Sequence, residues 1–206
     1  LSLTHPHDPF AIPRRYLERF QQEEIDLPQT GINDVDNDAH SQRLRAMYQL
    51  EEGQLTEEHI RRARHAYYGA LAYVDDCFGE VIRTLEETGQ AENTIVFVIA
   101  DHGEMLGERG LWYKMTFFEG ASRVPMIVHN PKRFAPRRVA QNVSLVDLLP
   151  TLTELAGGVA RLQHPVAPLD GHSLLPYLNG EDGPDEACSE YLAEGALAPM
   201  LMIRRG

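Results

Sequence analysis

The chain has 206 residues, 43% of them hydrophobic, and its formal net charge is −12 at pH 7. This acidic balance argues against nucleic acid as a partner, because binding to phosphate groups needs a basic surface, and it is compatible with a cationic substrate. No apolar run approaches the roughly 18 residues of a membrane span, so we expect no membrane partner either. The two cysteines, Cys77 and Cys188, are too few for a disulfide framework. This indicates a reducing compartment, and we expect a cytoplasmic protein.

Both ends of the sequence have the pattern of interrupted strands. The chain opens with LSLTHPHDPF, without a methionine, and it stops within the apolar run MLMIRRG. A length of 206 residues suits one α/β domain or part of a larger one. We therefore expect this chain to be a fragment of a longer protein.

A proline-rich loop over residues 4–9 carries the first candidate functional residues, His5 and His7. Because proline restricts the backbone, we expect these two imidazoles to have fixed directions. Taken alone, the pattern favours a turn with two solvent-exposed histidines. A short helix is expected over residues 14–21, followed by an irregular insertion over residues 22–40.

Three aspartates alternate within this insertion, as they do in a calcium-binding loop: Asp34, Asp36 and Asp38. Such a loop needs a glycine at its sixth position and a glutamate at its twelfth. Those positions hold Ala39 and Arg45. We therefore interpret the three aspartates as solvated loop residues.

The longest predicted element is a helix over residues 56–88. Thr56 is a suitable N-cap, and Gly89 is a suitable residue to end the helix. Asp75 and Asp76 are adjacent, so their side chains point about 100° apart, and we interpret them as surface residues rather than as a second metal site. Apolar residues at three- and four-residue spacing form one face of the helix: Ile60, Ala63, Tyr67, Ala70, Leu71, Val74, Cys77, Phe78, Val81, Ile82 and Leu85.

Residues 94–100 have the pattern of a fully buried strand in a mostly parallel sheet flanked by helices. The strand stops at Asp101, His102 and Gly103. Ligands bind at the carboxyl ends of strands in open α/β sheets. A carboxylate beside an imidazole, followed by a glycine that frees the backbone to turn, can form a metal site there. The alternative is that Asp101 caps the next turn and His102 is a polar loop residue.

A glycine-punctuated loop then continues to Lys114, and a loop beside a strand end carries function more often than packing. A short helix is expected over residues 115–122. Glu119 lies four residues before Arg123, so the two side chains can pair. Another buried strand is expected over residues 124–129.

The last predicted helix follows Ser144, which is expected to cap it, and ends at Gly157 and Gly158. A connector is expected over residues 158–168. The sequence contains no internal repeats and no low-complexity tracts.

These residues carry a family resemblance. The run ADHGEMLGERGLWYKMTFFEGASRVPMIVHNP resembles the C-terminal half of the sulfatase branch of the alkaline phosphatase superfamily, and the choline sulfatases in particular. VSLVDLLPTLTELAG, DGHSLLPYLNG and SEYLAEGALAPMLMIRRG are similar to later segments of the same family. The resemblance implies an α/β fold in which residues 1–158 form part of an alkaline-phosphatase-like mixed sheet flanked by helices. Residues 159–206 are then a connector and the truncated beginning of a smaller C-terminal α+β subdomain.

The resemblance also implies the roles of the site residues. His7 is expected to contact the sulfate ester as a catalytic residue, with His5 as the alternative, and Lys114 to touch a sulfate or leaving-group oxygen. Asp101 and His102 are expected to supply part of the shell of a divalent metal. Such a shell suits Ca²⁺, our first expectation, with Mg²⁺ or Mn²⁺ as alternatives, whereas zinc more usually has denser His or Cys ligation.

The sequence departs from the family at the nucleophile. Sulfatases use a formylglycine made from a Cys or Ser in a Cys-x-Pro-x-Arg-like stretch, and neither Cys77 nor Cys188 has that context. Formylglycine is therefore expected outside this chain. The chain alone is expected to be inactive.

The expected reaction is hydrolysis of a sulfuric ester, and the expected substrate is choline sulfate. Glu190 is expected to face the choline, with Glu194 as the alternative, and Trp112 is a candidate for a cation–π contact. The competing interpretations are an exposed strand carboxylate and a packing aromatic. A phosphonate monoester or phosphodiester hydrolase of the same superfamily and a non-catalytic sulfatase-like domain are the other hypotheses. We expect the full-length protein to be a homo-oligomer, either a dimer or a tetramer.

Overall fold

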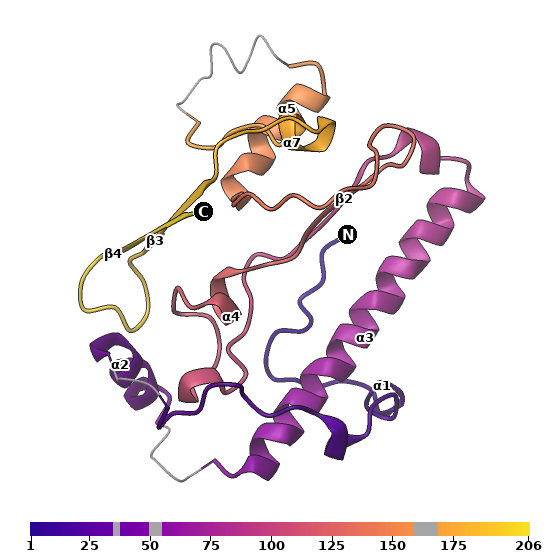
Figure 1. The fold of residues 1–206 in the computed structure, drawn as a ribbon. Coiled ribbons are helices and arrows are strands. Elements are labelled where there is room, and N and C mark those ends of the chain that lie inside the picture. The colour runs from indigo at the N-terminus through magenta and orange to yellow at the C-terminus, as the bar shows by residue number, and fades with distance from the viewer. Residues whose placement is uncertain (35–37, 50–54, 159–168) are drawn as a thin grey trace.

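The computed structural model describes residues 1–34, 38–49, 55–158 and 169–206 (Figure 1). The architecture is mixed α/β, as the sequence predicts. The helices are α1 (Arg14–Leu17), α2 (Ala39–Met47), α3 (Glu57–Glu87), α4 (Glu119–Ser122), α5 (Leu148–Leu155) and α7 (Leu175–Asn179). The strands are β1 (Val96–Ile99), β2 (Met126–His129), β3 (Glu186–Tyr191) and β4 (Met200–Arg205). Short 3₁₀ turns lie at Gln22–Glu24, Ala91–Asn93, Glu108–Gly110 and Leu145–Asp147.

Helix α3 runs along one side of the molecule, and the β3–β4 hairpin lies on the opposite side (Figure 1). The β1–β2 pair lies between them, and α4 and the connections of this pair approach α2 at one end. The first residues of the chain enter the same central region (Figure 1). Segments from the N-terminus, from the end of β1 and from the region before β2 are therefore neighbours.

Strands β1 and β2 are antiparallel, with Val96 opposite His129 and Ile99 opposite Met126. The prediction of fully buried strands in a mostly parallel sheet is wrong within the described ranges. Ile99 is 41% exposed, and Ile127 in β2 is 56% exposed. A continuous apolar run indicates that a strand suits burial on both faces, but it does not specify the direction of its neighbour.

Helix α3 has the boundaries that the sequence predicts. The Thr56 hydroxyl accepts a hydrogen bond from the His59 N–H at 3.3 Å, and the His59 side chain accepts one from the Thr56 N–H. Gly89 has φ +69°, the left-handed conformation that commonly ends a helix. Asp76 binds Arg19 at 2.6 Å and Asp75 is exposed, so both are surface residues as expected.

The apolar face of α3 is covered only in part. The helix packs on α1 and on the turn at Gln22–Glu24. Ala70 is fully buried, whereas Cys77 is half-buried and Leu71 is 41% exposed. Helical periodicity thus identified the face, but it did not show how far the neighbouring segments extend over it.

The insertion after α1 is more ordered than predicted. Helix α1 stops at Leu17, earlier than expected, and α2 follows without having been predicted. Asp38 is not a solvated loop residue: its carboxylate accepts from the Ser41 N–H at 2.9 Å and caps α2. Asp34 accepts from the Gly31 N–H at 2.7 Å, and Asp36 lies outside the described residues.

The later helices follow the predicted order with shorter bounds. Helix α4 occupies only the end of the predicted 115–122 segment, and Glu119 pairs with Arg123 at 3.4 Å as expected. Ser144 and Asp147 form the predicted type of helix start, in which the Asp147 carboxylate accepts from the Ser144 N–H at 2.7 Å. Gly157 has φ +76° just beyond α5.

A small apolar core lies beneath the loop that joins β1 to β2. Its buried members are Leu44, Met105, Leu111, Met115 and Ala121. Leu44 comes from α2 and Ala121 from α4, so the core ties the loop to two helices. Four half-buried aromatics pack around it: Tyr48, Tyr113, Phe118 and Tyr191.

No helix within the described ranges is long and apolar enough to cross a membrane. The predicted division between residues 1–158 and 159–206 stays a prediction, because most of the connector lies outside the part of the chain that the structure describes.

Candidate functional site

His7 and Lys114 are in direct contact, although 107 positions separate them in the sequence. The Lys114 Nζ donates to His7 Nε2 at 2.8 Å. On the other side of the ring, His7 Nδ1 lies 2.8 Å from the Asp8 carbonyl oxygen and 3.1 Å from Asp8 Oδ1. Since both of these neighbours are acceptors, Nδ1 carries the proton, and Nε2 is free to accept from the ammonium.

Asp101 and His102 lie beside this pair. The rings of His7 and His102 are 6.3 Å apart between centroids, and His102 Nε2 is 3.7 Å from Asp101 Oδ2. The His102 Nδ1–H donates to the Gly103 carbonyl oxygen at 2.8 Å, which directs Nε2 outward. The structure thus brings together His7, Asp101, His102 and Lys114.

The donor atoms of Asp101 and His102 fit part of a metal shell. The Asp101 side chain is 88% exposed, and one of its oxygens accepts from the His102 N–H at 3.0 Å. Its second oxygen and the outward imidazole nitrogen can bind one cation together. Within the described ranges no three His, Cys, Asp or Glu residues gather as a complete metal site. Asp101 and His102 are therefore two candidate ligands among the residues that the structure describes.

Gly103 is required by close packing rather than by a left-handed turn. A Cβ on this residue would lie 2.1 Å from the Gly120 carbonyl oxygen. The Gly103 N–H donates to Ala121 O at 2.7 Å, and the Glu104 N–H donates to Gly120 O at 2.8 Å. Helix α4 therefore holds the backbone immediately after the Asp101–His102 corner.

The loop from this corner to Lys114 has a strained backbone. Leu106, Arg109 and Tyr113 have φ values of +48°, +57° and +64°, which side-chain-bearing residues rarely adopt. Each such conformation costs on the order of 1–3 kcal/mol and persists only where the surrounding structure holds it. Glu104 Oε1 accepts from the N–H groups of both Leu106 and Tyr113. The strained ends of the loop are thus fixed by one carboxylate.

Two arginines hold the same loop from the helices. Arg64 on α3 is 5% exposed and donates to the Leu106 carbonyl at 3.1 Å, while Arg45 on α2 donates to the Arg109 carbonyl at 3.1 Å. Glu108 accepts from the backbone N–H groups of Gln29 and Thr30 at 3.0 Å each. These contacts fix the outer part of the loop.

Burial raises the pKa of Glu104, and the negative charge of Asp8 acts in the same direction. The N–H groups of Tyr113 and Leu106 and the nearby Lys114 ammonium lower this pKa and offset part of the effect. The charge state of Glu104 therefore depends both on Lys114 and on Asp8, the neighbour of His7.

Comparison with known proteins identifies the fold. The sulfatase family profile matches residues 1–159. The chain belongs to the sulfatase family. It is 40% identical over 207 aligned positions to the choline-sulfatase of Rhizobium meliloti (strain 1021), and the match covers 100% of this chain and 40% of that protein. It is 37% identical over 158 positions to arylsulfatase K of Danio rerio, covering 74% of this chain and 29% of that protein.

Solved structures share the fold of this chain. The phosphonate monoester hydrolase SpPMH of Silicibacter pomeroyi superposes with a TM-score of 0.76 at 31% identity, over 90% of this chain and 38% of that one. The phosphonate monoester hydrolase of Agrobacterium radiobacter gives 0.72 at 26% identity, over 93% and 41%. The chain spans 40% or less of the length of the two curated relatives named above. The predicted family and fold class are confirmed.

His5, the alternative to His7, points elsewhere in this sulfatase-family chain. Its Nε2 lies 3.2 Å from the Ala11 carbonyl, and its ring meets that of Tyr73 edge-on at 5.0 Å. His7 is thus the histidine that the structure brings to Lys114.

The two candidate substrate residues come from the loop before Lys114 and from β3. Trp112 packs at the base of the loop, where a Cβ on Gly107 would lie 3.5 Å from the Trp112 ring and 3.5 Å from Ile60. Glu190 is exposed on β3 opposite Leu201. Contact of Trp112 and Glu190 with a substrate stays a prediction.

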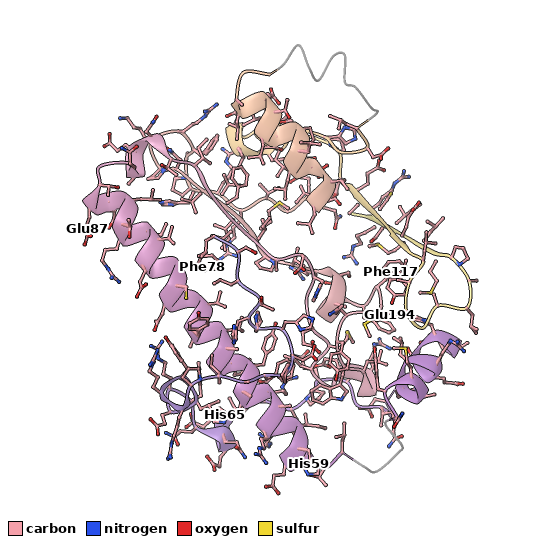
Figure 2. All side chains as sticks on the ribbon, turned by 180° about the vertical axis from the view of Figure 1, so that it is seen from behind. His59, His65, Phe78, Glu87, Phe117 and Glu194 are labelled. Carbon is pink, nitrogen blue, oxygen red and sulfur yellow. The ribbon has the colours of Figure 1, made fainter. Side chains whose placement is uncertain are left out.

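Glu194, the alternative to Glu190, lies near Phe117. Figure 2 shows Glu194 and Phe117 together on the side of the molecule away from α3, which His59 and Glu87 mark at its two ends. The Tyr191 hydroxyl donates to the Glu194 carbonyl oxygen at 2.5 Å, and the Tyr191 ring meets that of Phe117 edge-on.

Sequence reasoning missed the residues that hold the loop. Glu104 follows the Asp-His-Gly corner directly and Arg64 interrupts the apolar face of a helix, so both carried a usable signal. A charged residue inside an otherwise apolar face is expected to have a buried partner. Arg45 carried no such signal, because α2 itself was not predicted.

Proposed function

We propose that the protein containing this chain hydrolyses sulfate monoesters, and that His7, Asp101, His102 and Lys114 are part of its active site. The observation that carries the proposal is the direct contact of Lys114 Nζ with His7 Nε2 beside the Asp101–His102 corner. Membership of the sulfatase family supports the reaction class.

The chemistry of sulfate esters suits these groups. The ester is anionic and its alkoxide is a poor leaving group, so hydrolysis needs positive charge around the oxygens and a proton for the departing oxygen. In our proposal an ester oxygen binds the Lys114 ammonium, which acts as a point charge. His7 then turns its Nε2 to the leaving oxygen and, once protonated there, donates the proton to it.

Asp101 and His102 would hold a divalent cation together with ligands from outside this chain. Such an ion supplies Lewis acidity and favours the anionic form of an oxygen nucleophile. We propose Ca²⁺, with Mg²⁺ and Mn²⁺ as alternatives. The nucleophile of the family is a formylglycine, and the two cysteines here, Cys77 on α3 and Cys188 on β3, lack its sequence context. We therefore propose that the 206 residues alone are inactive.

The proposed substrate is choline sulfate. The 40% identity to a choline-sulfatase over the whole chain supports this choice, and the net charge of −12 is compatible with a cationic ester. Glu190, with Glu194 as the alternative, and Trp112 are proposed to contact the choline. We also propose a cytoplasmic homo-oligomer, a dimer or tetramer.

A phosphonate monoester hydrolase is the second candidate, because two solved enzymes of that kind superpose with TM-scores of 0.76 and 0.72. We would compare kcat/KM of the intact protein for choline sulfate, 4-nitrophenyl sulfate and phenyl phosphonate monoester. We expect choline sulfate to give the highest value. A higher value for the phosphonate would favour the second candidate, and no turnover of any of the three would reject both.

A further inference from the structure

The loop that ends at Lys114 closes on itself through one side chain. Glu104 Oε1 accepts from the Leu106 N–H at 3.3 Å and also from the Tyr113 N–H. The Met105 N–H donates to the Tyr113 carbonyl at 2.8 Å, so Tyr113 is bound through both of its peptide groups. These contacts join the residue before Lys114 to the residues after the Asp-His-Gly corner.

We propose that Glu104 is a positioning residue for Lys114, and that it acts through the Tyr113 peptide to keep the ammonium within reach of His7 Nε2. The kinetic part of this inference rests on the proposed sulfate ester hydrolysis; the structural part does not. No catalytic contact of Glu104 with substrate is invoked.

Backbone conformation gives the physical reason. Tyr113 has φ +64°, and this conformation is kept only when its surroundings favour it. If Tyr113 relaxes to an extended conformation, the direction of the chain at Lys114 changes and the ammonium leaves His7. A displacement of about 1 Å at a reacting group is enough to lower a rate roughly 10²-fold.

Substitutions at Glu104 can separate the effect of its hydrogen bonds from the effect of its charge. Both N–H groups bind the same oxygen of Glu104, so the amide oxygen of a glutamine can accept both bonds. Methionine has a similar shape and cannot accept them. Glu104→Gln should therefore keep Lys114 in place, and Glu104→Met should release it.

Glu108 provides a matched control within the same loop. Its carboxylate also accepts two backbone N–H bonds, but from Gln29 and Thr30, which anchor the outer part of the loop. Glu108→Met should loosen that anchor while the bonds around Tyr113 persist.

The chain offers a direct measure of Lys114, because Lys114 and Lys132 are its only lysines. Lys132 is 69% exposed on the surface and pairs with Glu92, so it serves as an internal reference. We would acylate the intact protein briefly with acetic anhydride and measure the Lys114:Lys132 labelling ratio by peptide mass spectrometry. We expect the ratio to rise about threefold or more in Glu104→Met, as local opening frees the amine. It should stay near the wild-type value in Glu104→Gln and Glu108→Met.

Kinetics then test the consequence. On 4-nitrophenyl sulfate, Glu104→Met should lower kcat by about 10²-fold with a much smaller change in KM, and Glu104→Gln should restore most of the rate. If Glu104→Met does not fold by circular dichroism, Glu104→Asp replaces it, since that variant keeps the charge but withdraws the oxygen by one methylene.

Equal ratios in wild type and in Glu104→Met or Glu104→Asp would overturn the proposal. So would an equal rise in Glu108→Met, which would mean that Glu104 supports the loop only in a general way. If the wild-type protein hydrolyses no sulfate ester, the proposed function fails, but the labelling ratio still decides the role of Glu104.

Discussion

The two sides of the candidate site are built differently. On one side, Lys114 and His7 meet through a contact between distant parts of the sequence, and Glu104 fixes the backbone that carries the ammonium. On the other side, Asp101 and His102 bind only neighbouring backbone in the hydrogen bonds that the structure records for them, and the Asp101 side chain is 88% exposed.

This difference separates what the chain completes from what it leaves open. On the cationic side, Lys114 and His7 bind each other within the described residues. The Asp101–His102 side presents donor atoms to solvent, as expected of ligands that share a cation with residues from elsewhere. The cationic side should therefore respond to substitutions within this chain, and the other side to metal supply.

The largest expected effect comes from Lys114→Met in the intact protein. Removing the ammonium should lower kcat/KM for 4-nitrophenyl sulfate by about 10³-fold, since a preorganised charge at a developing anion is lost. Lys132→Met is the control and should change the rate by less than about twofold, because Lys132 forms a surface ion pair. Comparable losses in both variants would contradict a specific role for Lys114.

Asp101→Asn should weaken the other side of the site. We expect metal bound per protein, measured by mass spectrometry after dialysis, to fall along with activity, and excess Ca²⁺ to restore part of the activity. Loss of a charged ligand should reduce metal affinity by about 10²-fold or more. Asp75→Asn, an exposed site on α3, should leave the metal content unchanged. Unchanged metal content in Asp101→Asn would remove Asp101 from the shell.

A pair of glycine substitutions tests how firmly the corner is packed. In Gly103→Ala the new Cβ would meet the Gly120 carbonyl at 2.1 Å, so we expect a loss of about 2 kcal/mol in the free energy of unfolding. Gly79→Ala on α3 meets no atom within 4 Å and should raise stability by about 0.5–1 kcal/mol. The melting temperatures of the two variants should therefore shift in opposite directions. A shift of the same sign would show that the backbone around Gly103 and Gly120 relaxes to accommodate the new Cβ.

The smallest expected effect is a pH dependence of stability at Asp26, which pairs with the loop-holding Arg64. The Tyr68 hydroxyl donates to Asp26 at 2.6 Å, and this bond, with Arg64, holds the pKa of Asp26 below its ordinary value despite partial burial. A carboxyl with a lowered pKa stabilises the fold above its unfolded pKa, and that contribution is lost as pH falls through the folded pKa. Asp26→Asn should therefore lose less stability than wild type on acidification below about pH 4.

The size of this effect is limited because the Asp26 side chain is 51% exposed, so we expect no more than about 1 kcal/mol. Asp75→Asn is again the control. If the free energy of unfolding falls equally with pH in wild type and in Asp26→Asn, Asp26 contributes nothing to the pH dependence of stability.

Part of the site could be predicted from local patterns, whereas the assignment of His7 and Lys114 depended on the family resemblance. A strand end placed Asp101 and His102, and prolines around His7 indicated a directed imidazole. The capping residues of α3 were also readable, since Thr56 and Gly89 act through bonds to their immediate neighbours. The roles of the site residues stay predictions.

The remainder depends on contacts that no local pattern contains. The cap of α2, Asp38, stands among other aspartates, so its helix was hidden. The packing of Gly103 depends on Gly120, and this pair is recognisable only once both backbones are placed. The antiparallel direction of β1 and β2 likewise depends on how the two strands pair and cannot be read from the residues of either strand alone.

The separation of 107 positions between His7 and Lys114 has a consequence for how the molecule matures. Contacts of such high sequence distance form only after the intervening chain has closed, which is slow compared with helix formation. During refolding, α3 should therefore gain its ellipticity well before the imidazole meets the ammonium. A refolding intermediate that already contains α3 should therefore still lack the Lys114–His7 contact.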